Sequence, residues 1–167
     1  MSIVLGIDLG LTGAVARLGF RDPVVADLPL TEDRGTKVVD VRELRSMLRQ
    51  LVPAYDGQAL VVIEDVRIRA MPGRPMSHSN EGKLMRTRGH VEALVWLLGW
   101  RLEVVQPASW KREFGLLGKK DEPVDKDAAR VKALELWPGL AAELKRKLDH
   151  NRADAIFLAR FGQLRFA

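Results

Sequence analysis

Residues 3–10 read Ile-Val-Leu-Gly-Ile-Asp-Leu-Gly, an apolar run that leads into an acid. Such a run predicts a buried strand. After a turn at residues 10–13, the pattern predicts a second strand over 13–18 and a third over 24–30. These strands follow one another too closely for crossover helices, because parallel strands need a long connection between them. The sequence therefore predicts an antiparallel meander at the start of the fold.

Helices and strands alternate after the meander. Asp40 is expected to cap a helix over 41–51, and an apolar strand over 59–63 ends at Glu64. The remaining predicted elements are a helix over 84–98, a strand over 102–105, a helix over 126–137, and a helix over 149–161 closed by Gly162. We expect basic loops over 67–83 and 115–125. The order βββ-α-β-α-β-α-α predicts an α/β fold with a mixed five-stranded sheet flanked by helices.

Composition narrows the class of protein. The 167 residues predict a single domain over 1–167, and the absence of cysteine excludes a disulfide framework, a thiolate zinc site and a cysteine nucleophile. The net charge of +5 favours a polyanionic partner, although solubility alone would also account for it. No apolar stretch reaches the roughly 18–20 residues of a membrane span, and the N-terminal stretch carries Asp8. We therefore expect a cytoplasmic protein with no membrane partner.

Three acids stand at the edges of apolar segments. Asp8 and Glu64 end predicted strands, and sites in open α/β sheets form outside the carboxyl ends of strands. Asp154 leads into the apolar stretch of the last predicted helix. Taken singly, each acid also has a structural interpretation, such as a turn former or an ion-pair partner. Together, these hard oxygen ligands suit Mg²⁺ or Mn²⁺, and two such ions would clamp a phosphodiester during in-line displacement.

Several short motifs resemble one family. Residues 6–10, Gly-Ile-Asp-Leu-Gly, resemble the opening of the RuvC-type Holliday junction resolvases, the crossover junction endodeoxyribonucleases. Val62-Ile63-Glu64 resembles their second acidic strand end, and Arg152-Ala153-Asp154-Ala155 resembles their closing helix. This chain also resembles the phage-type branch of the family over residues 70–73, 85–89, 106–111 and 126–129. The opening also resembles sugar kinases and actin-like ATPases, but those need two such domains, and 167 residues leave no room for them.

The resemblance implies a ribonuclease H-like fold, a homodimer and metal-dependent cleavage of branched DNA. Such an enzyme resolves four-way junctions by paired symmetric nicks that leave 5′-phosphate and 3′-hydroxyl ends. It implies two ions of Mg²⁺ or Mn²⁺ per site, held by Asp8, Glu64 and Asp154, and no organic cofactor. Family members place an Asp or His three or four residues before the last acid. His150 is therefore expected as the fourth ligand or as a proton carrier, with Asp149 and Asn151 as alternatives.

DNA binding is expected from basic and polar side chains near the acids, because phosphate contacts dominate affinity. The expected DNA-binding residues are Arg67, Arg69, Arg74, Ser79, Asn80, Lys83, Arg86, Arg88, Lys111, Lys119 and Lys120. Bacterial members carry an aromatic shortly after the second acid, where this chain has Val-Arg-Ile-Arg over 66–69. Trp96 and Trp100 lie four residues apart on a predicted helix that is apolar over more than one face, which favours a homodimer interface.

Two other functions stay open at this point. The chain could be a non-catalytic protein that binds DNA structures on the same fold. It could also be a ribonuclease H-like nuclease that acts on other branched or hybrid substrates, since the chemistry would be the same. Three acids beside DNA argue against a pure binder, because they repel phosphate unless a metal ion intervenes.

Overall fold

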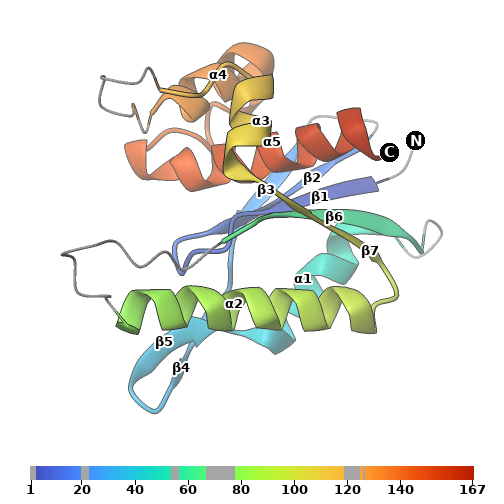
Figure 1. Ribbon diagram of the computed structural model, residues 1–167, viewed down its shortest axis with the longest axis vertical. Helices are drawn as coiled ribbons and strands as arrows, with labels where there is room; N and C mark the ends of the chain where they lie inside the picture. Colours follow the sequence, from blue (N-terminus) through green and yellow to red (C-terminus); the bar gives the residue numbers. More distant parts are fainter. Residues whose placement is uncertain (1–2, 20–22, 54–56, 67–77, 119–124, 126) are drawn as a thin grey trace.

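The computed structural model describes residues 3–19, 23–53, 57–66, 78–118, 125 and 127–167. A mixed five-stranded sheet in the order β3-β2-β1-β6-β7 forms its centre (Figure 1). The strands are β1 (Ile3–Ile7), β2 (Ala14–Leu18), β3 (Val24–Asp27), β6 (Ala59–Glu64) and β7 (Arg101–Val105). Strands β1 to β3 pair antiparallel, whereas β1, β6 and β7 run parallel. The predicted α/β class, meander and mixed five-stranded sheet are confirmed.

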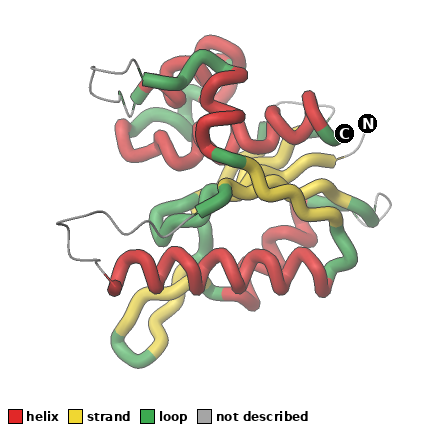
Figure 2. Tube along the Cα trace, in the orientation of Figure 1, coloured by secondary structure: helices red, strands yellow, loops and turns green. Residues whose placement is uncertain are grey.

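Helices cover both faces of the sheet (Figures 1 and 2). One face carries α1 (Val41–Leu51) and α2 (His78–Leu97). The other carries α3 (Pro107–Glu113), α4 (Ala128–Leu136) and α5 (His150–Arg165), with two short 3₁₀ turns, η1 (Pro138–Leu140) and η2 (Lys147–Asp149), between α4 and α5. Among the described helices, none combines the length and apolar character that crossing a bilayer requires.

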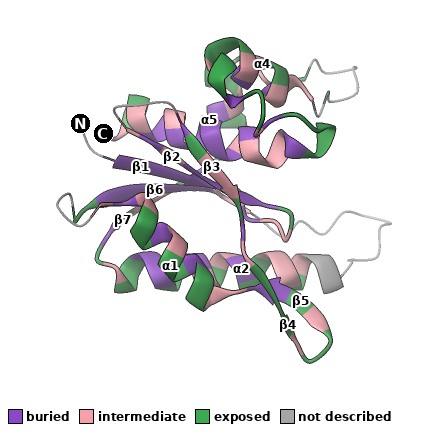
Figure 3. Ribbon diagram, turned by 180° about the vertical axis from the view of Figure 1, so that it is seen from behind, coloured by how far each residue is buried: buried purple, intermediate pink, exposed green. Residues whose placement is uncertain are grey.

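The central strand β1 is buried on both faces, as Figure 3 shows for the middle of the sheet. Successive side chains of a strand point to opposite faces. Val4 accordingly packs into the core beneath α5, whereas Ile3, Leu5 and Ile7 pack into the core beneath α1 and α2. This double burial explains why residues 3–7 read as a continuous apolar run rather than as an alternating one.

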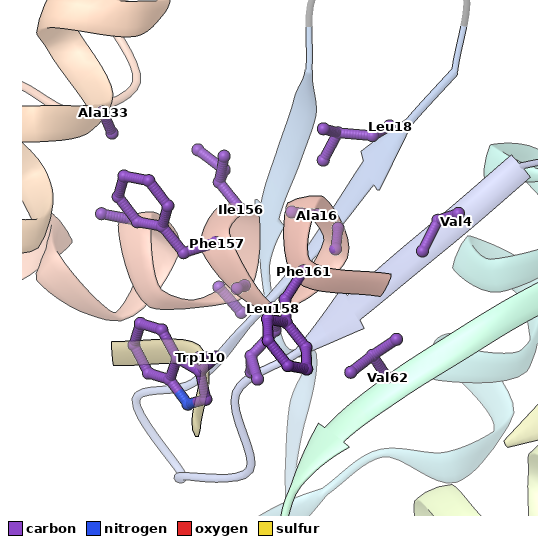
Figure 4. Packing of buried hydrophobic residues seen from close by; sticks show 14 of the residues in the cluster. Val4, Ala16, Leu18, Val62, Trp110, Ala133, Ile156, Phe157, Leu158 and Phe161 are labelled. Atoms are coloured by element: carbon purple, nitrogen blue, oxygen red, sulfur yellow. The ribbon is translucent and has the colours of Figure 1, made fainter. Parts of the chain in front are cut away.

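Helix α5 lies directly on the sheet because glycines allow a close approach. Figure 4 shows Leu158 and Phe161 of this helix on the side of the strand residue Val62, whereas Phe157 lies toward Ala133 of α4. Gly162 is buried, and a Cβ at this position would lie 2.5 Å from Val62 Cγ2. The prediction that Gly162 ends the helix was wrong: α5 continues to Arg165, and the glycine serves packing instead.

One other predicted helix boundary differs from the structure, and one helix was missed. Asp40 caps α1 as expected, since its Oδ1 accepts hydrogen bonds from the backbone amides of Arg42 and Glu43. Helix α2, however, begins at His78, so part of the loop predicted over 67–83 is helical, and residues 67–77 lie outside the described residues. Helix α3 was not predicted. It begins at Pro107, a residue suited to the first helical position because its missing N–H would have no partner there.

A second, smaller sheet was missed as well. The third strand was expected to run over 24–30, but β3 ends at Asp27. The chain then forms a separate hairpin of β4 (Leu30–Asp33) and β5 (Thr36–Val39), which protrudes beyond α2 in Figure 1. Most of β4 is exposed, so it carries no run of apolar residues that would mark a strand.

The hairpin turn contains a strained residue. Arg34 has a φ of 51° and Gly35 a φ of 75°, the combination of a type I′ turn. Asn-Gly fits this turn better, because asparagine adopts the left-handed region at lower cost than arginine. We expect Arg34→Asn to raise the free energy of unfolding by about 0.5–1 kcal/mol, measured by urea denaturation. Arg34→Gln removes the same charge without easing the backbone, and an equal gain there would assign the effect to charge.

Candidate active site

Two acids meet at one end of the sheet. Strands β1 and β6 are parallel neighbours, with Ile7 opposite Ile63. Asp8 directly follows Ile7, and Glu64 directly follows Ile63, so the two carboxylates leave the sheet at the same edge. Both residues are half-buried, which suits groups that adjoin the core and still reach solvent.

The third acid comes from α5, which packs on β1 close to Gly6. The charges of Asp154 and Glu64 raise the pKa of Asp8, but burial contributes most, and together they bring this pKa to about 7. Burial, with a contribution from Glu64, raises the pKa of Asp154 to about 6. Burial also raises the pKa of Glu64. The structure thus brings together Asp8, Glu64 and Asp154, three acids that are far apart in the sequence.

Lys111 of α3 lies among these acids. Its positive charge lowers the pKa of Asp8, Glu64 and Asp154 and so opposes the effect of burial. Its Nζ lies 5.1 Å from the ring centroid of Trp110, which is within cation–π range. The Trp110 ring is buried, and its N–H lies near Glu64 but outside hydrogen-bonding geometry. Sequence reasoning did not anticipate that Lys111 lies beside the carboxylates, and its contact with DNA stays a prediction.

The three candidates for the fourth metal-binding position, Asp149, His150 and Asn151, make different hydrogen bonds. The buried Asp149 accepts hydrogen bonds from the Arg146 guanidinium at 2.7 Å and from the Arg146 amide at 2.7 Å. Asn151 donates to the Thr12 carbonyl at 2.7 Å and to its hydroxyl at 2.9 Å. His150 Nδ1 lies 3.0 Å from the Lys147 carbonyl, and its charge lowers the pKa of Asp154. If Nδ1–H donates to that carbonyl, His150 presents Nε2 as a free lone pair near Asp154.

The three carboxylates fit a hard divalent cation, since carboxylate oxygens are the ligands that Mg²⁺ and Mn²⁺ prefer. The raised pKa values of Asp8 and Asp154 point the same way, because a cation would relieve their mutual repulsion. Within the described part of the chain, no three His, Asp or Glu side chains are already gathered closely enough to hold an ion. Their charges therefore affect one another's pKa, but the three carboxylates do not form a closed coordination shell.

Comparisons with known proteins bear on the fold. Neither a scan against family models nor a search of curated proteins found a match. Among solved structures, Thermus thermophilus RuvC in complex with a Holliday junction substrate aligns with a TM-score of 0.55 and 14% identity, covering 98% of this chain and 96% of that one. The chain has the RuvC fold. The yeast mitochondrial Holliday junction resolvase Ydc2 aligns with a TM-score of 0.51 and 16% identity, covering 95% of this chain and 76% of its own.

The RuvC fold also positions the segment that follows Glu64. The Arg88 guanidinium of α2 pairs with Asp65 at 3.1 Å and donates to the Val66 carbonyl at 3.2 Å, and it also pairs with Glu92 at 2.8 Å. Gln106 donates to Asp65 from the end of β7. A cavity of about 500 Å³ opens between Glu64 and the start of α3. Arg88 therefore supports the backbone beside this cavity, and its expected contact with DNA stays a prediction.

The other expected DNA-binding residues fall into three groups. Arg86 pairs with Asp33 of the hairpin at 2.8 Å on the surface, and Lys83 is half-buried on α2. Ser79 and Asn80 lie in the first turn of α2, and their side chains are not among those described. Five residues lie outside the described part of the chain: Arg67, Arg69, Arg74, Lys119 and Lys120.

The raised carboxyl pKa values predict a pH dependence of stability without added metal. Asp8 and Asp154 ionise near pH 3.8 when unfolded but near pH 7 and pH 6 when folded. The native state therefore binds more protons than the unfolded state between these limits, and stability falls as pH rises from about 4 to 7. We expect a melting temperature in EDTA that decreases over this range, a smaller decrease in Asp8→Asn, and Mg²⁺ stabilisation that is larger at pH 8 than at pH 5. A melting temperature that rises through pH 6–7 in EDTA would contradict the assignment.

Proposed function

We propose that this protein is a metal-dependent endonuclease that resolves four-way DNA junctions. The observation that carries the proposal is the group of Asp8, Glu64 and Asp154 around Lys111, at the carboxyl ends of β1 and β6 of a RuvC fold. Three mutually repelling, partly buried acids would weaken DNA binding and cost stability in a protein that only binds. A nuclease has a use for them, because divalent cations hold the scissile phosphate between such carboxylates.

Asp8, Glu64, Asp154 and His150 would hold Mg²⁺ or Mn²⁺, with two ions per site. Bound ions of this kind polarise the phosphate and activate the attacking water. In-line attack on phosphorus breaks the bond to O3′ and leaves a 5′-phosphate and a 3′-hydroxyl. His150 Nε2 either ligates the second ion or delivers the proton that O3′ takes up. The Lys111 ammonium lies where it can offset negative charge on the phosphate.

A homodimer would place two such sites on the two strands of one junction. Near the end of helix α2, Leu97 is 84% exposed and Trp96 is 65% exposed. Two large apolar side chains exposed side by side are typical of a protein–protein interface. Trp100, by contrast, is buried and donates from its indole to the Gly57 carbonyl at 3.2 Å, so it belongs to the core. We propose Trp96 and Leu97 as part of a twofold interface, which accounts for paired symmetric nicks. Cytoplasmic location stays a prediction.

The deciding experiment incubates the protein with a synthetic four-way junction in Mg²⁺, in Mn²⁺ and in EDTA. Linear duplex and an RNA–DNA hybrid of the same sequence serve as controls. Symmetric nicks that need metal and occur only in the junction support the proposal. Tight junction binding without cleavage in either metal would instead make the protein a DNA-structure binder. Preferential cutting of the hybrid would assign it to another substrate class on the same fold.

The fourth position has its own test. We expect His150→Ala to reduce single-turnover cleavage about 10²-fold or more, because it removes a ligand or a proton carrier, while junction binding is kept. Asn151→Ala is the matched neighbour: it removes two hydrogen bonds to Thr12 and should lower stability by about 1 kcal/mol with little change in the cleavage step. The reverse pattern, a slow Asn151→Ala and an unchanged His150→Ala, would move the fourth role to Asn151.

A further inference from the structure

A groove of about 780 Å³ lies on the face of the sheet that α3, α4 and α5 cover. It adjoins Leu18, the last residue of β2, which is paired with Val4 near the start of β1. The carboxylates lie at the other end of β1, beyond Ile7. The groove and the candidate active site are therefore at opposite ends of the sheet, and a molecule in one leaves the other accessible.

The groove has an apolar interior. Phe114 and Trp137 form part of it and pack on the core from their other sides. Leu136 at the end of α4 is 52% exposed, and Leu164 near the end of α5 is 48% exposed. A partner that covers these leucines would gain binding free energy, because burying each side chain removes apolar surface from water.

The charges around the groove are unbalanced. Lys132 and Arg160 line it, and among the described residues neither has a carboxylate partner. Arg160 instead donates to the Gln163 side chain at 3.0 Å. The acid of the groove, Glu113, is already paired with Arg165. The groove therefore presents two positive charges that no described acid neutralises, above an apolar interior.

We propose that this groove binds an acidic, amphipathic segment of a partner protein. Leucine or aromatic side chains of that segment fill the space between Leu136, Leu164 and Trp137, and its carboxylates pair with Lys132 and Arg160. Nucleic acid fits the groove less well, because phosphates gain nothing from exposed leucines and the apolar walls would stay uncovered. The proposal does not rest on the nuclease function, and it describes a contact that can persist while DNA is bound at the other end of the sheet.

The test uses a random library of 12-residue peptides displayed on phage, selected on the wild-type protein. We expect enriched peptides to combine acidic with large apolar residues. A synthetic, fluorescein-labelled copy of one of them should bind with an affinity that falls at least tenfold, by fluorescence anisotropy, in Leu136→Asp and in Lys132→Glu. Val131→Asp on the same helix and Lys145→Glu are the matched controls, since both residues are outside the groove and exposed. Circular dichroism checks that all four variants are folded.

Three results would overturn the proposal. The first is enrichment of peptides without acidic and apolar character. The second is binding that Leu136→Asp and Lys132→Glu leave unchanged. The third is displacement of the peptide by a short DNA duplex at equal affinity in wild type and Asp8→Asn, which would make the groove a nucleic-acid surface. None of these results depends on whether the protein cleaves junctions.

Discussion

Asp8→Asn is expected to abolish junction cleavage while junction binding is kept or strengthened. Asp8 has the most strongly raised pKa of the three acids, because its carboxyl is shielded from water and lies near both Asp154 and Glu64. An amide in its place removes a metal ligand and also removes a charge that repels phosphate. We expect a loss of at least about 10³-fold in single-turnover cleavage, beyond the roughly 10²–10³-fold typical for loss of one stabilising hydrogen-bond donor at an active site.

The matched control is Asp40→Asn, the same substitution at the cap of α1. Asparagine caps helices about as well as aspartate, so stability and cleavage should both stay close to wild type. Cleavage is measured with a labelled junction in Mg²⁺ and in Mn²⁺, and binding is measured in Ca²⁺ or EDTA. Wild-type cleavage by Asp8→Asn would exclude Asp8 as a ligand and with it the proposed metal site.

The two strand-end acids were predictable because their strands are buried on both faces. A run such as residues 59–63 has to leave the core at its end, and the first polar residue there, Glu64, marks the sheet edge. Asp154 was predictable for a related reason, since α5 is apolar on nearly every side beyond it. In each case the local sequence carries the constraint, because burial acts on consecutive residues.

The place of Lys111 could not be predicted from sequence, because it depends on where α3 turns after β7. The Arg88–Asp65 pair could not be predicted for a similar reason: the two residues are 23 positions apart, and no local pattern reveals the pair. The β4–β5 hairpin was missed because β4 is mostly exposed and has no apolar run to signal a strand. The assignment of the fourth position to His150 stays a prediction, and the contacts of Asp149, His150 and Asn151 that bear on it could not be derived from the sequence. Side-chain contacts, not backbone propensity, decide these features.

Gly6→Ala is expected to destabilise the protein strongly, because a methyl group has no room at this position. A Cβ on Gly6 would overlap the Ala155 carbonyl oxygen and the Ala159 amide nitrogen of α5. Both are backbone atoms of a helix, so relief requires moving the whole of α5 away from β1. We expect the free energy of unfolding to fall by about 3 kcal/mol or more, at or beyond the upper range for inserting methylenes into a packed core. Urea denaturation followed by circular dichroism measures it.

Gly89→Ala separates this clash from a general effect of adding a methyl group. Apart from the neighbouring backbone of α2 itself, nothing lies within 4 Å of a Cβ at Gly89, so alanine there should gain up to about 1 kcal/mol from helix propensity. Equal stability of Gly6→Ala and wild type would mean that β1 and α5 are not in close contact.

The contact between Gly6 and α5 also affects the candidate active site, because Asp154 directly precedes Ala155. Any shift of α5 that makes room for a methyl at Gly6 also moves Asp154 relative to Asp8, so the folded fraction of Gly6→Ala should bind Mn²⁺ more weakly than wild type does.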